Sequence, residues 1–232
     1  MNLLYYSGTS MKFYDFAVFA PNPWIVWIFA QEKGIKLERC EVDLLTRENR
    51  REPFLSEVNP LGELPAIVTQ EGHPLSEVVP ICEYLEDSFP SLPLIGSTPW
   101  ERAETRMWVR RIDQNIAWPM GEGFSIEDGR SFFEADEKDS DIKSRKVLLP
   151  REAAPILKNK VVAKLVWLDS QMQGREWICD NRYTLADIYL YAFLQFGENH
   201  GQPLPTGCEW LHDFFSRMKK RPYAWHGKPG SL

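Results

Sequence analysis

The sequence predicts an α/β N-terminal half followed by an all-helical C-terminal half. Residues 11–89 alternate short β-like runs with helical patterns, whereas the residues after 98 show only helical patterns. Between the two halves, residues 88–98 contain two prolines, one glycine and no charge, which is typical of a linker. We therefore expect one domain at residues 1–88 and a second at residues 98–232.

The composition excludes several classes of protein. The 232 residues carry 27 basic and 33 acidic side chains, a net charge of −6, so no basic face for nucleic acid is expected. The longest apolar run, residues 24–30, is far shorter than the ~20 residues that span a bilayer. Lys12 and Asp15 interrupt any apolar core of a signal peptide. We expect a soluble cytoplasmic protein without a nucleic-acid or membrane partner.

Cysteine and histidine spacing predicts no metal centre. The four cysteines form no CxxC pair, and the four histidines share no ligand spacing with them or with one another. Signatures of serine hydrolases, P-loops and zinc proteases are missing from the sequence as well. Aromatic residues reach 13%, and this leaves two alternatives: an aromatic core, or an aromatic-lined pocket for a flat organic ligand.

The N-terminal half is predicted as strand, helix, strand, short helix, hairpin and helix. Strands are expected at residues 12–16 and 36–43, with a helix at 23–33 that begins at a proline and stops at Gly34. A short helix follows at 52–59, then a hairpin of residues 66–69 and 73–76 around a turn at 70–72. Apolar residues at helical spacing from Val78 to Leu85 predict the last helix.

The C-terminal half is predicted to be helical, with one irregular segment. Thr98 with Glu101, and Thr184 with Asp187, match capping boxes at helix starts, the first of a helix over residues 100–116. Three apolar stripes at helical spacing run through residues 157–172, 185–196 and 211–218. Residues 121–149 are polar and rich in turn-forming residues, and we expect them to be irregular and either functional or mobile.

Five strings carry a resemblance to a known family. They are APNPWIV at 20–26, EKGI at 32–35, NPLGELPA at 59–66, EVVPICEYLE at 77–86 and TLAD at 184–187. In order and spacing the chain resembles the glutathione transferase family over residues 11–225, which leaves residues 1–10 as a candidate extension. The resemblance implies a thioredoxin-like N-terminal domain with a cis proline, an all-α C-terminal domain, glutathione as co-substrate and a homodimer.

The resemblance also implies a site for glutathione. Asn22 stands where the family keeps the residue that activates the thiol, and it is either a hydrogen-bond donor to a thiolate or the N-cap of the following helix. Leu64 and Pro65 would pair with the cysteinyl backbone of glutathione. Asn49 and Arg50 would lie near the glycyl carboxylate, although Arg50 also fits a solvated basic run.

The sequence departs from the family at the residues expected to bind the γ-glutamyl end of glutathione. Glu77 would pair with the ammonium, while Val78 stands where the family usually has a serine. Together with the missing Tyr, Ser or Cys at position 22, this favours a rival function, a non-catalytic binding or structural protein of the same fold. A third alternative, a disulfide reductase, is disfavoured because no cysteine lies near position 22.

The expected reaction joins the glutathione thiolate to an apolar, aromatic electrophile in a pocket between the domains. Candidate residues for that pocket are Phe19, Met107, Arg111, Asn115 and Trp118. Arg111 would neutralise an anionic substrate group or pair with a neighbouring acid. Residues 81–90 are similar to bacterial members of the family that cleave β-aryl ethers with glutathione, which makes ether or halide displacement part of the expectation.

Overall fold

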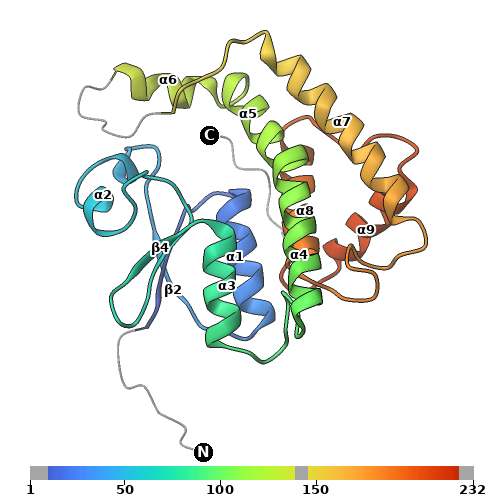
Figure 1. Ribbon diagram of the computed structural model, residues 1–232. Helices are drawn as coiled ribbons and strands as arrows, with labels where there is room; N and C mark the ends of the chain where they lie inside the picture. The colour runs from blue at the N-terminus through green and yellow to red at the C-terminus, as the bar shows by residue number, and fades with distance from the viewer. Residues whose placement is uncertain (1–9, 139–145, 225–232) are drawn as a thin grey trace, which may run out of the picture.

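The computed structural model describes residues 10–138 and 146–224 and shows an α/β domain beside a helical domain, as predicted (Figure 1). In the first domain, β1 (Lys12–Asp15) pairs in parallel with β2 (Glu38–Glu41) and antiparallel with β3 (Ala66–Val68). The hairpin partner β4 (Pro74–Ser76) completes a sheet of order β2-β1-β3-β4. Each strand is shorter than its predicted range.

Two helices cover one face of this sheet. These are α1 (Pro21–Glu32) and α3 (Val78–Ser88), which pack side by side in Figure 1. Alternation along β1 sends Phe13 into the main core with these helices. Tyr14 packs on the opposite side, in a smaller cluster with Phe54 from the short helix α2 (Phe54–Glu57), which follows the 3₁₀ turn η1 (Glu48–Arg50).

The second domain is built around one buried helix. It contains α4 (Pro99–Ile112), the π-helical segment η2 (Asp113–Ala117), α5 (Trp118–Ile126), α6 (Arg130–Lys138), α7 (Ala153–Met172), α8 (Leu185–Asn199) and α9 (Glu209–Lys219). Residues 185–197 of α8 are buried, and α8 contacts both α1 and α4. The two predicted capping boxes are confirmed, at Thr98–Glu101 and at Thr184–Asp187. No helix in the described part of the chain is both long and apolar enough to cross a bilayer.

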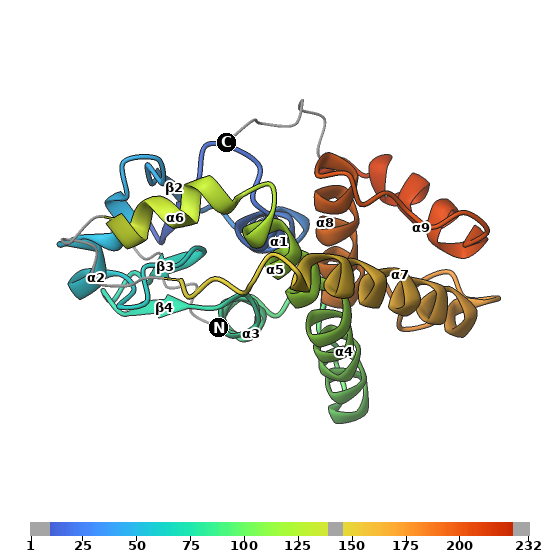
Figure 2. The same ribbon diagram turned by 90° about the horizontal axis from the view of Figure 1, so that it is seen from above.

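The prediction of an irregular segment at 121–149 is wrong for most of its length. Helix α5 extends to Ile126 and α6 occupies Arg130–Lys138, while residues 139–145 lie outside the described part. A tertiary contact joins α6 to the first domain: Arg47 donates to the Phe132 carbonyl at 2.7 Å, and its guanidinium lies 4.2 Å from the centre of the Phe132 ring. Seen from above, α6 extends over the first domain (Figure 2).

A buried ion pair fixes the segment between the domains. Lys33 Nζ lies 2.7 Å from Glu86 Oε2, with both side chains almost fully buried. Lys33 also donates to the carbonyls of Ser91 and Leu92, while Glu86 accepts from the Ile95 amide at 2.8 Å. This one pair therefore holds the segment that connects the two domains at several points.

Candidate active site

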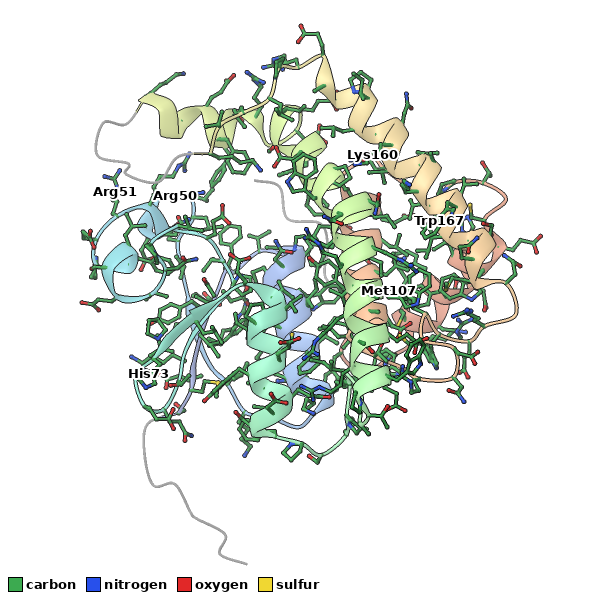
Figure 3. The ribbon with its side chains drawn as sticks, viewed as in Figure 1. Arg50, Arg51, His73, Met107, Lys160 and Trp167 are labelled. Carbon is green, nitrogen blue, oxygen red and sulfur yellow. The ribbon has the colours of Figure 1, made fainter. Side chains whose placement is uncertain are left out.

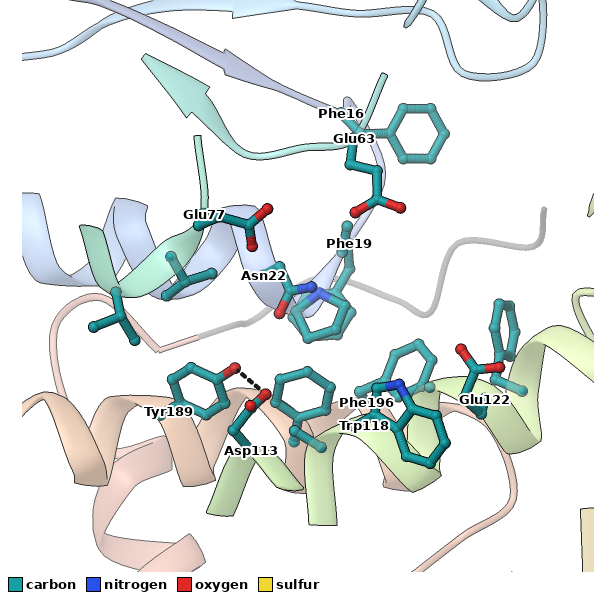
Figure 4. Close-up of a pocket in the computed structure, with 18 of the residues that line it drawn as sticks. Phe16, Phe19, Asn22, Glu63, Glu77, Asp113, Trp118, Glu122, Tyr189 and Phe196 are labelled. Carbon is teal, nitrogen blue, oxygen red and sulfur yellow. Dashed lines mark hydrogen bonds between the residues drawn. The ribbon is translucent and has the colours of Figure 1, made fainter. Parts of the chain in front are cut away.

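A pocket of about 760 Å³ lies between the two domains (Figure 4). One wall comes from the loop before α1, the start of α1, the loop before β3 and the start of α3. The opposite wall comes from α4, η2, α5, α6 and α8. A volume of this size is in the range of small-molecule sites in proteins.

Asn22 lies at the N-terminus of α1, on the first wall of the pocket. The helix begins at Pro21 and its N-cap is Ala20, so the alternative that Asn22 is the N-cap is wrong. Pro21 and Pro23 lack N–H groups, which leaves Asn22 as the one residue among the first three of α1 with a backbone donor. Its amide side chain adds a second donor at the positive end of the helix.

Carboxylates approach Asn22 from three separate segments. Figure 4 shows Glu63 and Glu77 projecting from the first wall into the space around Asn22 and Phe19, with Asp113 of η2 on the opposite wall. Tyr189 Oη donates to Asp113 Oδ1 at 2.9 Å. Burial raises the pKa of the Glu77 carboxyl, and the negative charges of Glu63 and Asp113 raise it further.

Aromatic side chains line the remainder of the pocket. They come from the loop before α1 and from α5, α6 and α8: Phe19, Trp118, Phe124, Phe132, Phe133, Phe193 and Phe196. His200 lies among them, its ring 4.5 Å from the ring centres of both Phe124 and Phe196, and burial lowers its pKa. Aromatic rings therefore line the pocket, and others such as Phe13 and Phe29 fill the core. That the pocket takes a flat organic ligand stays a prediction.

The structure places Phe19 and Trp118 in the pocket but not the other three residues predicted there. Arg106, Val109, Arg110 and Asp113 share the pocket face of α4 and η2 at helical spacing. Met107, Arg111 and Asn115 follow one another at intervals of four and lie on another face, where Arg111 and Asn115 line a small hollow with Trp167 of α7. Figure 3 shows Met107 and Trp167 on the same side of the molecule. The predicted assignment of these three is corrected, because the sequence does not show which face of α4 turns to the first domain.

Asn49 and Arg50 also lie outside the pocket. Asn49 Nδ2 donates to the Gly62 carbonyl and Arg50 Nη1 donates to the Leu61 carbonyl at 2.8 Å, with only 6% and 7% of these residues exposed. Gly62 has a φ of +62°, and a Cβ there would lie 2.4 Å from the Asn49 carbonyl oxygen. These two side chains therefore support the loop before β3, and their predicted role at a glycyl carboxylate stays a prediction.

The same loop ends at a cis peptide bond between Leu64 and Pro65. The Leu64 side chain packs on the cluster around Phe54, and the pairing of its backbone with glutathione stays a prediction. Val78, at the first turn of α3, lines the pocket and is 6% exposed. Four further residues that the sequence did not predict line the pocket: Glu63, Asp113, Tyr189 and His200. The helical spacing of residues 106, 109, 110 and 113 is a sequence signal that places Asp113 on the same face as the other three.

Comparison with known proteins agrees with this architecture. A family model described as "Glutathione S-transferase, N-terminal domain" matches residues 19–88, and one described as "Glutathione S-transferase, C-terminal domain" matches residues 131–222. Glutathione S-transferase GstA of Escherichia coli O157:H7 is 28% identical over 84% of this chain and 87% of its own. Protein LigF of Sphingobium is 28% identical over 82% of each chain.

Solved structures show the same fold. A glutathione S-transferase domain-containing protein of Marinobacter aquaeolei aligns with a TM-score of 0.80 at 25% identity, over 92% of this chain and 100% of its own. The beta-etherase LigF of Sphingobium aligns with a TM-score of 0.76 at 24% identity, over 93% of this chain and 97% of its own. With both domains matched in order, the chain belongs to the glutathione S-transferase family.

Proposed function

We propose that this chain joins the thiolate of glutathione to an apolar aromatic electrophile. The observation that carries the proposal is the continuity of one pocket, which runs from the donors of Asn22 to a set of aromatic rings. Relatives solved with glutathione support the co-substrate: a glutathione S-transferase of Methylobacillus flagellatus has it bound, at 22% identity over 95% of this chain and 100% of its own, with a TM-score of 0.70.

In the proposed reaction, the Asn22 side-chain amide and backbone N–H donate to the glutathione sulfur. These donors and the helix end stabilise the thiolate relative to the thiol. Glu77 holds the ammonium of the γ-glutamyl group. The sulfur lone pair attacks the electrophilic carbon, a C–S bond forms, and the leaving group departs with its bonding pair. Holding both reactants in one pocket supplies much of the rate enhancement.

The electrophile is proposed to be an aryl compound. Flat rings stack well on the phenylalanine and tryptophan side chains of the second wall. Among the relatives, LigF is a beta-etherase, which favours aryl ethers beside aryl halides as substrates. We also propose the homodimer that the family resemblance implies, and size-exclusion chromatography with light scattering tests it.

The experiment combines binding with turnover. Calorimetry at millimolar glutathione should show binding, and a panel of aryl halides and aryl ethers should show conjugate formation by mass spectrometry. Trp118→Ala should lower kcat/KM for these substrates about 10-fold, since one of the aromatic side chains that line the pocket is removed. Met107→Ala is the matched control, because Met107 lies on α4 outside the pocket lining. If no heat and no thermal shift appear with glutathione, the non-catalytic alternative replaces this proposal.

A further inference from the structure

One face of α8 contributes a row of side chains to the second wall of the pocket. Tyr189, Phe193, Phe196 and His200 follow one another at intervals of four, three and four residues, and all four line the pocket. His200 is the C-cap of α8, and its backbone N–H donates to the Phe196 carbonyl at 3.1 Å. At about 1.5 Å per residue this row is roughly 16 Å long, so its two ends meet different parts of a ligand.

The Tyr189 end of the row lies at the reacting end of the pocket. Tyr189 donates to Asp113 at 2.9 Å, and Figure 4 shows this pair across the pocket from Asn22, with Phe196 further along the wall. His200 follows one helical turn beyond Phe196, in the direction away from Tyr189. A substrate attacked by a sulfur at Asn22 therefore meets His200 with the end of the molecule that does not react.

His200 is a polar side chain among apolar rings. Its ring centre lies 4.5 Å from the ring centres of both Phe124 and Phe196, and these two are 5.1 Å from each other. Within residues 10–138 and 146–224, neither nitrogen of the His200 ring has a hydrogen-bond partner. A ligand that covers the ring displaces water from these nitrogens, and it binds well only if it supplies a hydrogen bond in exchange.

The surroundings of His200 favour the neutral imidazole. Burial lowers the pKa of His200, and the negative charge of Asp128 acts more weakly in the opposite direction. The other charged side chains on the neighbouring segments are paired with one another: Glu122 with Lys146, and Glu127 with Lys158. The ring is therefore neutral at neutral pH, with one nitrogen as an acceptor and the other as a donor.

We propose that His200 forms a subsite for a phenolic hydroxyl on the aryl electrophile, with an imidazole nitrogen accepting the hydrogen bond from that hydroxyl. This inference rests on the proposed function, because it names a substituent of the substrate bound in the same pocket. A phenol is a strong hydrogen-bond donor and a neutral imidazole nitrogen is a strong acceptor. A carboxylate in the same place would need a cation, and Lys146 already pairs with Glu122 at 2.6 Å.

The test compares three phenacyl chlorides that differ only in the para substituent of the ring, which is hydroxyl, methoxy or methyl. Glutathione displaces chloride from the same carbon in all three. Methyl matches the hydroxyl in size, and methoxy matches it in electron donation but has no O–H. At a pH where the phenol is neutral, we expect kcat/KM of the wild type to be about 5-fold higher for the hydroxyl compound than for either of the others.

A variant of His200 assigns the preference. His200→Phe should lower kcat/KM for the hydroxyl compound to the level of the methyl compound, because a phenyl ring occupies the same place without an acceptor. A urea midpoint near that of the wild type shows that the variant is folded. His73→Phe is the matched control, because His73 is exposed, lies just before β4 and is outside the pocket lining. It should keep the preference for the hydroxyl compound.

The pH dependence of the wild type gives a second measurement that needs no variant. Below the ordinary histidine pKa of about 6.5, the imidazolium forms and the acceptor nitrogen is lost. The ratio of kcat/KM for the hydroxyl compound to that for the methoxy compound should therefore fall as the pH is lowered. Ionisation of the glutathione thiol affects both substrates equally and cancels in this ratio.

The outcomes separate the inference from the proposed function. If all three compounds are conjugated without a preference for the hydroxyl, the inference is overturned and the proposed function stands. A preference that survives in His200→Phe, or a ratio that is constant with pH, also overturns the inference. If none is conjugated, the proposed function fails, and calorimetry with para-hydroxyacetophenone and para-methoxyacetophenone decides the subsite alone. Tighter binding of the hydroxyl compound by the wild type but not by His200→Phe would support the subsite, and equal binding would overturn it.

Discussion

Replacing Asn22 by alanine should lower kcat/KM about 10-fold without harming the fold. The substitution removes the side-chain donor but keeps the backbone N–H and the positive end of α1. A hydrogen bond to a charged group contributes about 1.5–3 kcal/mol, and we take the low end because the other donor and the helix terminus remain. At about 1.4 kcal/mol per factor of ten, the pKa of the bound thiol rises by about one unit.

The assay is the pH dependence of kcat/KM for one aryl substrate, together with the ultraviolet absorbance of the bound thiolate. The pH midpoint of kcat/KM and the pH midpoint of the thiolate absorbance should both move to higher pH by the same amount in Asn22→Ala. Asn22→Asp should be worse than the alanine variant, because it adds a carboxylate beside Glu63 and Glu77. The Asn22 side chain does not cap α1, so the urea midpoint of Asn22→Ala should stay near that of the wild type. An unchanged pH profile would refute the assigned role, and a complete loss of activity in a folded variant would refute the calculated magnitude.

Three further predictions concern α3, the connecting segment and α8. Val78→Ser should tighten glutathione binding about 10-fold by calorimetry, since a hydroxyl at the pocket end of α3 can donate to a ligand carboxylate; equal or weaker binding would contradict this. Lys33→Met should lower the free energy of unfolding by about 3–5 kcal/mol in urea melts, because Glu86 is left buried without its partner; a loss below ~1 kcal/mol would contradict this. Burial raises the pKa of Asp187 from 3.8 to about 7. The folded state therefore holds this proton more tightly than the unfolded state does, and the stabilisation that results is lost as the pH rises through about 7. Asp187→Asn should flatten that part of the stability–pH curve, and a parallel curve would show that Asp187 stays ionised.

The sequence by itself determined the features that depend on neighbours along the chain. Thr98 and Thr184 each cap a helix through a partner three residues away, and both boxes form as predicted. Gly34 lies directly after the first helix with a φ of +68°, where the glycine predicted the stop. The hairpin follows from the turn at residues 70–72 between two short runs, and the three apolar stripes follow from side-chain periodicity, which is why the fold class could be predicted.

The tertiary structure decided which of these residues meet. A helical pattern shows that α4 and η2 have two faces, but only their packing on α8 turns Asp113 of η2 toward the pocket and leaves Arg111 of α4 outside it. Arg50 looks like a ligand for an anion in the sequence, and only the fold shows that Arg50 Nη1 donates to the Leu61 carbonyl beside the bend at Gly62. Glu63, Glu77 and Asp113 come to the pocket from three separate segments of the chain. Their mutual repulsion depends on distance in space, and spacing along the sequence does not contain that distance.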